Sequence, residues 1–336
     1  MVQKQTAKEQ IQKILEEHGG KTADKTTSIL LQDPTLKELK PELEFISKNW
    51  RDPLRPAMIK LACEAVDGKP QSTEEVAMAM SLMNLSFYLW DDMLDKAPCR
   101  LFNPTLFGRF GEAPTLIMGG LASAKAFTIL NKANLDKARR RTIVALFWNM
   151  WAKMAKTEAV NLRTRKNQYS AKDKLLKIRA EAEADLENCL KMGAVLGNGS
   201  ENEIKSLGKY GLYVGIILEL QHDFQVSVNL TLELADKVRM SELPYTVLRA
   251  KEDSQDLQKN LKDMACKKTI GPKEIEKIVQ GVLATKILDN IEETIEKLTE
   301  KAIEELRWIK KKSAAKALYS FAEVQPRFFK ESLQQL

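Results

Sequence analysis

The chain has 336 residues, of which 44% are hydrophobic and 29% are charged, and its net charge is +7. It contains only two histidines, and its four cysteines, at positions 63, 99, 189 and 266, lack the spacing of a metal site or a disulfide framework. A zinc centre or a serine–histidine triad is therefore nearly excluded, and a reducing cytoplasm is the expected location.

The positive charge does not by itself predict binding to nucleic acid. Lysines alternate with glutamates along the expected helices, which is typical of solvated helix faces. We therefore expect no nucleic-acid partner, and any surplus charge would favour an anionic small molecule. No run approaches the roughly 20 apolar residues of a membrane span, so no transmembrane segment is expected. The first residues also lack the apolar core of a signal peptide.

Helical periodicity dominates the sequence, and no convincing alternation of period two is found. In chain order, helices are predicted at residues 1–19, about 36–48, 57–66, 74–94, 111–132, 134–164, 171–195, 201–234 and 273–312. The 201–234 segment is predicted as one helix or two. Turns or loops are predicted at 19–34, 50–56, 97–104 and 241–244, where glycine and proline gather. This pattern predicts one all-α domain over residues 1–336, with residues 1–48 as a helical extension packed on it.

Three carboxylates follow the apolar run 85–89, namely Asp91, Asp92 and Asp95. On a helix, Asp91 and Asp95 lie one turn apart on the same face, with Asp92 beside them. Such a face offers hard oxygen ligands to a divalent cation, and Mg²⁺ is the usual choice when phosphate supplies the other ligands. The alternative is a charged helix end at the surface.

Several motifs, in order from about Arg51 to Pro244, resemble those of the trans-isoprenyl diphosphate synthase family. Residues 51–56 (RDPLRP) resemble the family's Gly-Gly-Lys-x-x-Arg-Pro motif, and residues 89–95 (LWDDMLD) resemble its first aspartate-rich motif. Arg100 to Thr105 resembles the stretch that follows, and residues 220–223 lie where the family leads into its second aspartate-rich motif. The resemblance implies a single-domain helical bundle around a central cavity and a homodimer.

The sequence also departs from the family. The lysine and the histidine that bind isopentenyl diphosphate in the family correspond here to Asp52 and Asn84. The family's Lys-Thr pair before the second motif is Glu181-Ala182, and the motif itself has decayed to residues 222–226 (HDFQV). These losses make chain elongation by isopentenyl addition an unexpected activity.

The reaction expected instead needs one substrate. A Mg²⁺-dependent class I terpene synthase, a lyase, would ionise an allylic C15 or C20 prenyl diphosphate, release diphosphate and let the carbocation cyclise. Two alternatives stay open. One is a prenyltransferase, either similar to a prenyl diphosphate synthase or modifying a peptide, and the other is a non-catalytic subunit of a prenyl diphosphate synthase.

More than one Mg²⁺ ion is expected. Asp91, Asp92 and Asp95 would form the first site. For the second site the sequence offers two sets at positions i, i+4 and i+8, and it does not decide between them. They are Gln225, Asn229 and Glu233, and a set built on Asp223 with Ser227 and Thr231.

Cations and apolar walls are also predicted from the resemblance. Arg55 and Arg100 keep family positions near the substrate diphosphate. Arg179 lies on the helix whose family counterpart points at the diphosphate, and we assign it a catalytic role beside Asp91 and Asp92. Further diphosphate-binding candidates are Lys237 and Arg239. Phe87, four residues before the aspartates, is expected to form the floor of the hydrocarbon cavity, with ordinary core packing as the alternative.

Overall fold

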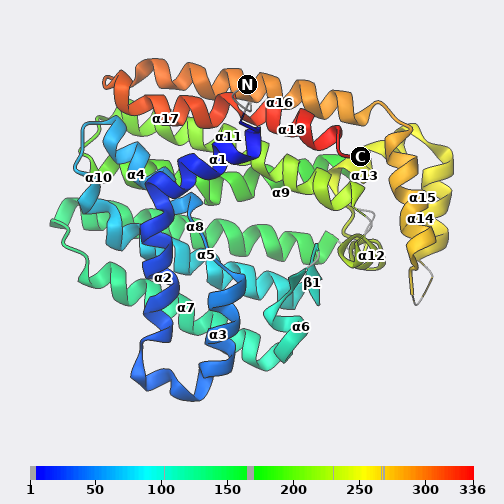
Figure 1. Cartoon of the computed structure of the whole chain (residues 1–336), viewed down its shortest axis with the longest axis horizontal. Helices are drawn as coiled ribbons and strands as arrows, with labels where there is room; N and C mark the ends of the chain where they lie inside the picture. Colours follow the sequence, from blue (N-terminus) through cyan, green and yellow to red (C-terminus); the bar gives the residue numbers. More distant parts are fainter. Residues whose placement is uncertain (1–4, 102, 165–169, 230, 266, 268) are drawn as a thin grey trace.

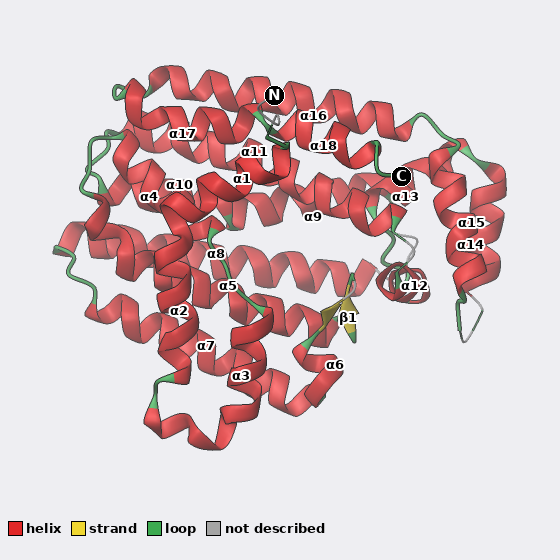
Figure 2. Ribbon diagram, viewed as in Figure 1, coloured by secondary structure: helices red, strands yellow, loops and turns green. Residues whose placement is uncertain are grey.

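The computed structural model describes the chain from residue 5 to residue 336, except residues 102, 165–169, 230, 266 and 268. The described part is a layered assembly of helices with one two-stranded hairpin, β1 (Cys99–Arg100) and β2 (Asn103–Pro104) (Figures 1 and 2). The predicted all-α fold class is confirmed.

Most helices of the amino-terminal half lie in the lower part of Figure 1. Its elements are α1 (Ala7–Leu15), a π-helix (Glu16–Gly20), α2 (Lys21–Leu31), a 3₁₀ helix (Pro34–Leu39), α3 (Lys40–Asn49), α4 (Leu54–Ala65), a 3₁₀ helix (Pro70–Thr73), α5 (Glu74–Leu94), α6 (Leu106–Phe110), α7 (Glu112–Lys132) and α8 (Lys137–Thr164).

The second half begins with the helices that face α5 and ends with those at the top and right of Figure 1. They are α9 (Ala171–Ala184), α10 (Leu186–Leu196), α11 (Glu201–Val228), α12 (Leu232–Arg239), α13 (Tyr245–Asp253), α14 (Gln255–Ala265), α15 (Pro272–Leu283), α16 (Ile287–Glu305), a 3₁₀ helix (Leu306–Trp308), α17 (Lys312–Glu323) and α18 (Gln325–Leu333).

Some local predictions were wrong. The stretch from Gly19 to Pro34 is mainly helical, and its glycines serve close packing, because a Cβ on Gly19 would lie 2.0 Å from the carbonyl oxygen of Pro53. Helix α4 begins at Leu54, since Pro56 lies in its first turn, where a missing N–H costs little. The predicted 171–195 helix divides at Asp185, whose φ and ψ are −94° and −91°.

Helix α5 carries the aspartates and packs along α7. Its end is fixed by Lys96, which adopts a left-handed φ of 47°. The N–H of Lys96 donates to the carbonyl of Met93, and that of Ala97 donates to the carbonyl of Asp92. This capping pattern stops the helix directly after Asp95, so the three carboxylates occupy the last turns of a buried helix.

Of the segment 1–48, predicted as an extension, the described part (residues 5–48) lies against the helices that follow it. Ile14 and Leu30 belong to the same hydrophobic core as α4, α5 and α10. Arg51 joins the segment to the loop before α4, because its guanidinium pairs with Glu16 at 2.6 Å and with Asp24 at 2.7 Å. Helix α7 is long and apolar enough to cross a membrane by length and composition alone, and 39% of its most apolar window is buried in the protein.

Candidate active site

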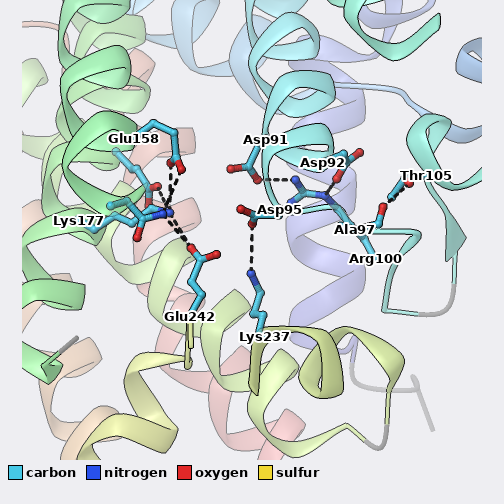
Figure 3. Close-up of polar contacts among 12 residues, drawn as sticks. Asp91, Asp92, Asp95, Ala97, Arg100, Thr105, Glu158, Lys177, Lys237 and Glu242 are labelled. Carbon is cyan, nitrogen blue, oxygen red and sulfur yellow. Dashed lines mark hydrogen bonds and ion pairs between the residues drawn. The ribbon is translucent and has the colours of Figure 1, made fainter. Parts of the chain in front are cut away.

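Asp91 and Asp95 face a cavity of about 100 Å³ lined by residues of α5, β1, α9, α11, α12 and the segment before α13. The close-up in Figure 3 shows both carboxylates opposite charged groups from α8, α9 and α12. The acidic residues of the lining are Asp91, Asp95, Glu181, Glu219, Asp223 and Glu242. The basic ones are Arg100, Lys174, Lys177 and Lys237. With all groups ionised, the lining carries more negative than positive charge.

Asp92 differs from its two neighbours. It is fully buried and accepts a hydrogen bond of 2.5 Å from Nε of Arg100. The same guanidinium donates to Asp91 at 2.6 Å and lies 4.3 Å from the ring centre of Tyr88. Arg100 therefore joins two aspartates, and Asp92 acts through Arg100 rather than from the cavity lining.

A cation fits between Asp91, Asp95 and Glu158 of α8. One oxygen atom from each carboxylate lies within 4.8 Å of the others, and hard oxygen ligands suit Mg²⁺. Burial and, next in size, the neighbouring charge of Asp91 together raise the pKa of Asp95 to about 6. Burial likewise raises the pKa of Asp92 to about 7, against the opposing effect of Arg100. A divalent cation would offset this crowding of negative charge, so the residues present fit Mg²⁺.

Lys177 and Lys237 reach the same cavity from α9 and α12. The ammonium of Lys177 donates to Glu242 at 2.9 Å and lies 3.5 Å from a carboxylate oxygen of Glu158. The ammonium of Lys237 lies 3.7 Å from a carboxylate oxygen of Asp95. Sequence reasoning gave no role to Glu158, Glu242 or Lys177. They come from distant segments, and no local spacing links them to the aspartates.

The set of Gln225, Asn229 and Glu233, one of the two options for the second metal site, assumes the spacing of one continuous helix, whereas the segment 201–234 divides after Val228. Helix α11 ends at Val228, and Asn229 caps it in an extended conformation with φ −83° and ψ 138°. Glu233 lies on the separate helix α12, where it accepts a hydrogen bond from the backbone N–H of Leu101 at 2.7 Å. Gln225, Asn229 and Glu233 therefore do not share one helix face.

Asp223 lines the cavity, but its carboxylate is already engaged. It accepts hydrogen bonds from the backbone N–H groups of Tyr245 and Thr246 at 2.8 and 3.0 Å, and from the Thr246 hydroxyl at 3.0 Å. These bonds cap the start of α13. In the alternative set for the second metal site, built on Asp223 with Ser227 and Thr231, the Ser227 hydroxyl donates to the backbone carbonyl of Asp223.

The predicted cations divide into two groups. Arg100 and Lys237 line the cavity. Arg179 and Arg239 are outside the lining, with side chains 58% and 43% exposed that pair with Glu183 and Asp236 on their own helices.

Arg55 is nearly buried and balanced by carboxylates. Its guanidinium lies 3.2 Å from Asp52 and 2.5 Å from Asp185. Asp52 also accepts hydrogen bonds from the backbone N–H groups at the start of α4. The aspartate at this position thus caps a helix and neutralises Arg55.

Phe87 lies in an aromatic cluster next to the aspartates. Its ring centre is 4.8 Å from that of Trp151, and the rings of Trp90 and Trp151 are 5.2 Å apart. A Cβ on Gly119 would lie 2.3 Å from Nε1 of Trp90, so α7 approaches α5 closely here. The floor role of Phe87 remains a prediction that this packing allows.

An all-α bundle with an aspartate-rich helix end at a charged cavity defines a class of protein, and the comparison with known families agrees. The family model described as polyprenyl synthetase matches residues 48–282, well over half of the chain. The chain belongs to this family, and the resemblance stated from its motifs is confirmed.

The relatives include the geranylgeranyl diphosphate synthase of Methanosarcina mazei, 27% identical over 58% of this chain and 61% of that protein. The geranylgeranyl diphosphate synthase of Saccharolobus solfataricus is 23% identical over 80% of this chain and 84% of its own length. The alignments to the first relatives span about three-fifths of those proteins.

Solved structures show the same fold. A geranylgeranyl pyrophosphate synthetase from Pyrococcus horikoshii superimposes with a TM-score of 0.81, at 20% identity, over 95% of this chain and 98% of its own. A polyprenyl synthase from Caulobacter crescentus, complexed with calcium and isoprenyl diphosphate, gives 0.80 at 17% identity over 95% and 97%.

The prediction of a terpene synthase, and with it of a lyase, was wrong. The relatives are named as synthases of prenyl diphosphates, not as cyclases. One of its two options for a second metal site, Gln225 with Asn229 and Glu233, assumed helical spacing beyond Val228, where α11 ends. The alternative of a prenyl diphosphate synthase agrees better with the comparisons.

Proposed function

We propose that the protein is a Mg²⁺-dependent prenyltransferase that elongates an allylic prenyl diphosphate with isopentenyl diphosphate. The observation that carries this proposal is the approach of Asp91, Asp95 and Glu158 to one point at the edge of a charged cavity. The names of the relatives support elongation as the reaction. Family membership favours an isoprenoid acceptor over a peptide.

The metal site would be built by Asp91 and Asp95, with Glu158 as a further ligand. Mg²⁺ bound there would neutralise the substrate diphosphate and favour its departure. Arg100 orients Asp91 by a bond of 2.6 Å and is itself fixed by Asp92. Arg100 and Lys237, both in the lining, would hold the departing diphosphate by charge-assisted hydrogen bonds. The aromatic cluster of Phe87, Trp90 and Trp151 would exclude water on the hydrocarbon side.

The region expected to bind isopentenyl diphosphate, the acceptor, carries less positive charge than the family resemblance implies. Arg55 is the cation there, and it is paired with Asp52 and Asp185. Isopentenyl diphosphate would have to compete with two carboxylates for this guanidinium. We therefore expect a high KM for the acceptor.

A direct test measures the incorporation of labelled isopentenyl diphosphate into longer prenyl diphosphates, with geranyl or farnesyl diphosphate as co-substrate. Removal of Mg²⁺ by a chelator, or the Asp91→Asn/Asp95→Asn variant, should reduce the rate at least about a hundredfold, because the metal ligands are lost. The matched control is Asp289→Asn on the exposed side of α16. Incorporation that persists in the double variant would reject the site.

One observation also supports a second candidate, a non-catalytic subunit that pairs with an active synthase. The three aspartates are paired with the chain's own cations, since Arg100 joins Asp91 and Asp92 and Lys237 approaches Asp95. Such a protein would show no turnover alone but would change the rate of a true synthase when mixed with it. Turnover by the purified chain excludes this candidate.

Assembly and location are further proposals. We propose a homodimer, because α7 and α8 expose several large apolar side chains, namely Leu116, Ile117, Phe127, Val144 and Trp148. The cytoplasm stays the proposed location, since Cys63, Cys99 and Cys189 are unpaired thiols.

A further inference from the structure

Glu242 lies inside the cavity because of how α12 ends. Ser241 adopts a left-handed φ of 57°, and the N–H of Glu242 donates to the carbonyl of Lys237 at 2.9 Å. The N–H of Ser241 donates to the carbonyl of Val238, which completes a Schellman-type cap. This turn brings Glu242, only 2% exposed, next to Lys177 of α9.

Lys177 is an ammonium among carboxylates. Its side chain is 8% exposed, and its Nζ lies 2.9 Å from Glu242, 3.5 Å from Glu158 and 3.7 Å from Glu181. A buried ammonium is costly unless anions surround it, so these partners keep it charged. Lys177 also precedes Glu181 by one helical turn, so both reach the same side of α9. Position 181 is where the resemblance expects a lysine, and the positive charge is therefore displaced by one turn rather than lost.

The segment from Lys237 to Glu242 supplies both a positive and a negative group to the cavity. Lys237 places its ammonium 3.7 Å from Asp95, where a metal ion would be bound. Glu242 places its carboxylate on Lys177, where a phosphate oxygen would be bound. Figure 3 shows the two pairs side by side, each joining this segment to the walls of the cavity. In the substrate-free protein, the site is thus filled by groups of the same charge as the expected ligands.

We propose that Lys177 is a diphosphate-binding residue of this site, and that Glu242 holds its ammonium in the substrate-free protein and releases it when a metal-bound diphosphate enters. The identity of the ligand rests on the proposed function. For Lys177 the exchange replaces one oxyanion by another, so its charge stays compensated. The incoming diphosphate would repel Glu242. The free energy of releasing Glu242 from Lys177 would therefore contribute to the measured binding affinity.

The test measures the affinity of inorganic pyrophosphate with Mg²⁺ by calorimetry on the full-length protein. Lys177→Met should weaken binding about tenfold or more, because one charge-assisted contact is lost. Glu242→Gln should tighten binding about threefold or more, because a neutral amide competes less well for Lys177. Lys172→Met, an exposed lysine on the same helix, is the matched control and should leave the affinity unchanged.

A second variant guards against loss of folding. Lys177→Met alone removes a cation that Glu158, Glu181 and Glu242 share, whereas Lys177→Met/Glu242→Gln removes one charge of each sign. The double variant should unfold at nearly the wild-type temperature and still bind pyrophosphate weakly.

Three outcomes would overturn the inference. Wild-type affinity in a folded Lys177 variant rejects Lys177 as a ligand and leaves the proposed function intact. Unchanged pyrophosphate affinity in the Glu242→Gln variant rejects the proposal that Glu242 competes with diphosphate for Lys177. If the wild-type protein does not bind pyrophosphate with Mg²⁺ at all, the proposed function fails together with the inference.

Discussion

The carboxylates around Asp91 and Asp95 are buried and crowded by one another, and the raised pKa values of several of them reflect this. Glu219 of α11 lies in the same lining. Burial and, next in size, the nearby carboxylates of Glu181 and Asp185 together raise its pKa to about 8. In the folded protein Glu219 therefore holds a proton over a pH range in which the unfolded chain releases it.

This shift predicts a pH dependence of stability. Between the ordinary glutamate pKa of 4.5 and about 8, the folded state binds more protons at this site than the unfolded state does, so its contribution to stability falls as the pH rises. Glu219→Gln removes that loss and should raise the melting temperature more at about pH 9 than at about pH 5. Calorimetric unfolding at the two pH values checks this. An equal effect at both, or one matched by the exposed Glu276→Gln, would contradict the assignment.

The negative charge of Asp52 leads to a prediction about the KM for isopentenyl diphosphate. Asp52→Lys exchanges a negative for a positive charge beside Arg55 and should lower the KM for isopentenyl diphosphate about tenfold, an effect of ~1.4 kcal/mol. Steady-state kinetics at saturating allylic substrate measures it. The substitution also removes the cap of α4, which costs about 1 kcal/mol of stability. Asp52→Ala loses the same cap and is the control. A lysine variant with the same KM as the alanine variant would reject the argument.

The packing of helix α5 against helix α7 positions the aspartates. Two adjacent glycines of α7 differ sharply in their surroundings. A Cβ on Gly119 would meet the indole of Trp90 at 2.3 Å, whereas a Cβ on Gly120 would meet nothing within 4 Å.

These glycines form a matched pair for mutation. Gly119→Ala should destabilise the protein by about 1–3 kcal/mol, since the indole and the helix must shift. Gly120→Ala should stabilise it by about 0.5–1 kcal/mol, because alanine is the better helix former. Chemical unfolding of both variants provides the measurement. Equal effects of the two substitutions would mean that α5 and α7 are not packed as described.

The sequence predicted elements well where periodicity is long, as in the helix 74–94 that became α5. It failed where packing decides the backbone. Gly19 looks like a turn residue but allows a close approach to Pro53, and Asp185 divides a helix without any breaking residue beside it.

The same distinction applies to the candidate site: residues on one helix could be predicted from the sequence, and residues from distant segments could not. Asp91 and Asp95 could be found because one helix turn separates them. Glu158 and Glu242 could not, because only the tertiary fold brings α8 and the end of α12 to the aspartates. The helical spacing assumed for Gln225, Asn229 and Glu233 does not hold, because the sequence pattern alone cannot reveal that α11 ends at Val228.

The proposed homodimer leads to a prediction about how Trp148 affects the oligomeric state. Its side chain is among the most exposed of the large hydrophobic residues described, at 70%, and it lies on α8. Trp148→Asp should convert a dimer into a monomer, because a charge would be buried at the contact. Trp308→Asp is the control, since Trp308 is 69% exposed but lies after α16. Light scattering after size exclusion gives the masses. A monomeric wild type, or a dimeric Trp148 variant, would contradict the proposal.

The central claim is that the protein elongates a prenyl chain rather than ionising one substrate alone. The measurement that tests this most directly is the release of diphosphate from geranyl or farnesyl diphosphate with Mg²⁺, in the presence and absence of isopentenyl diphosphate. We predict that release depends on the acceptor and equals the amount of longer prenyl diphosphate formed. Release at the same rate without acceptor, accompanied by hydrocarbon or alcohol products, would contradict the account.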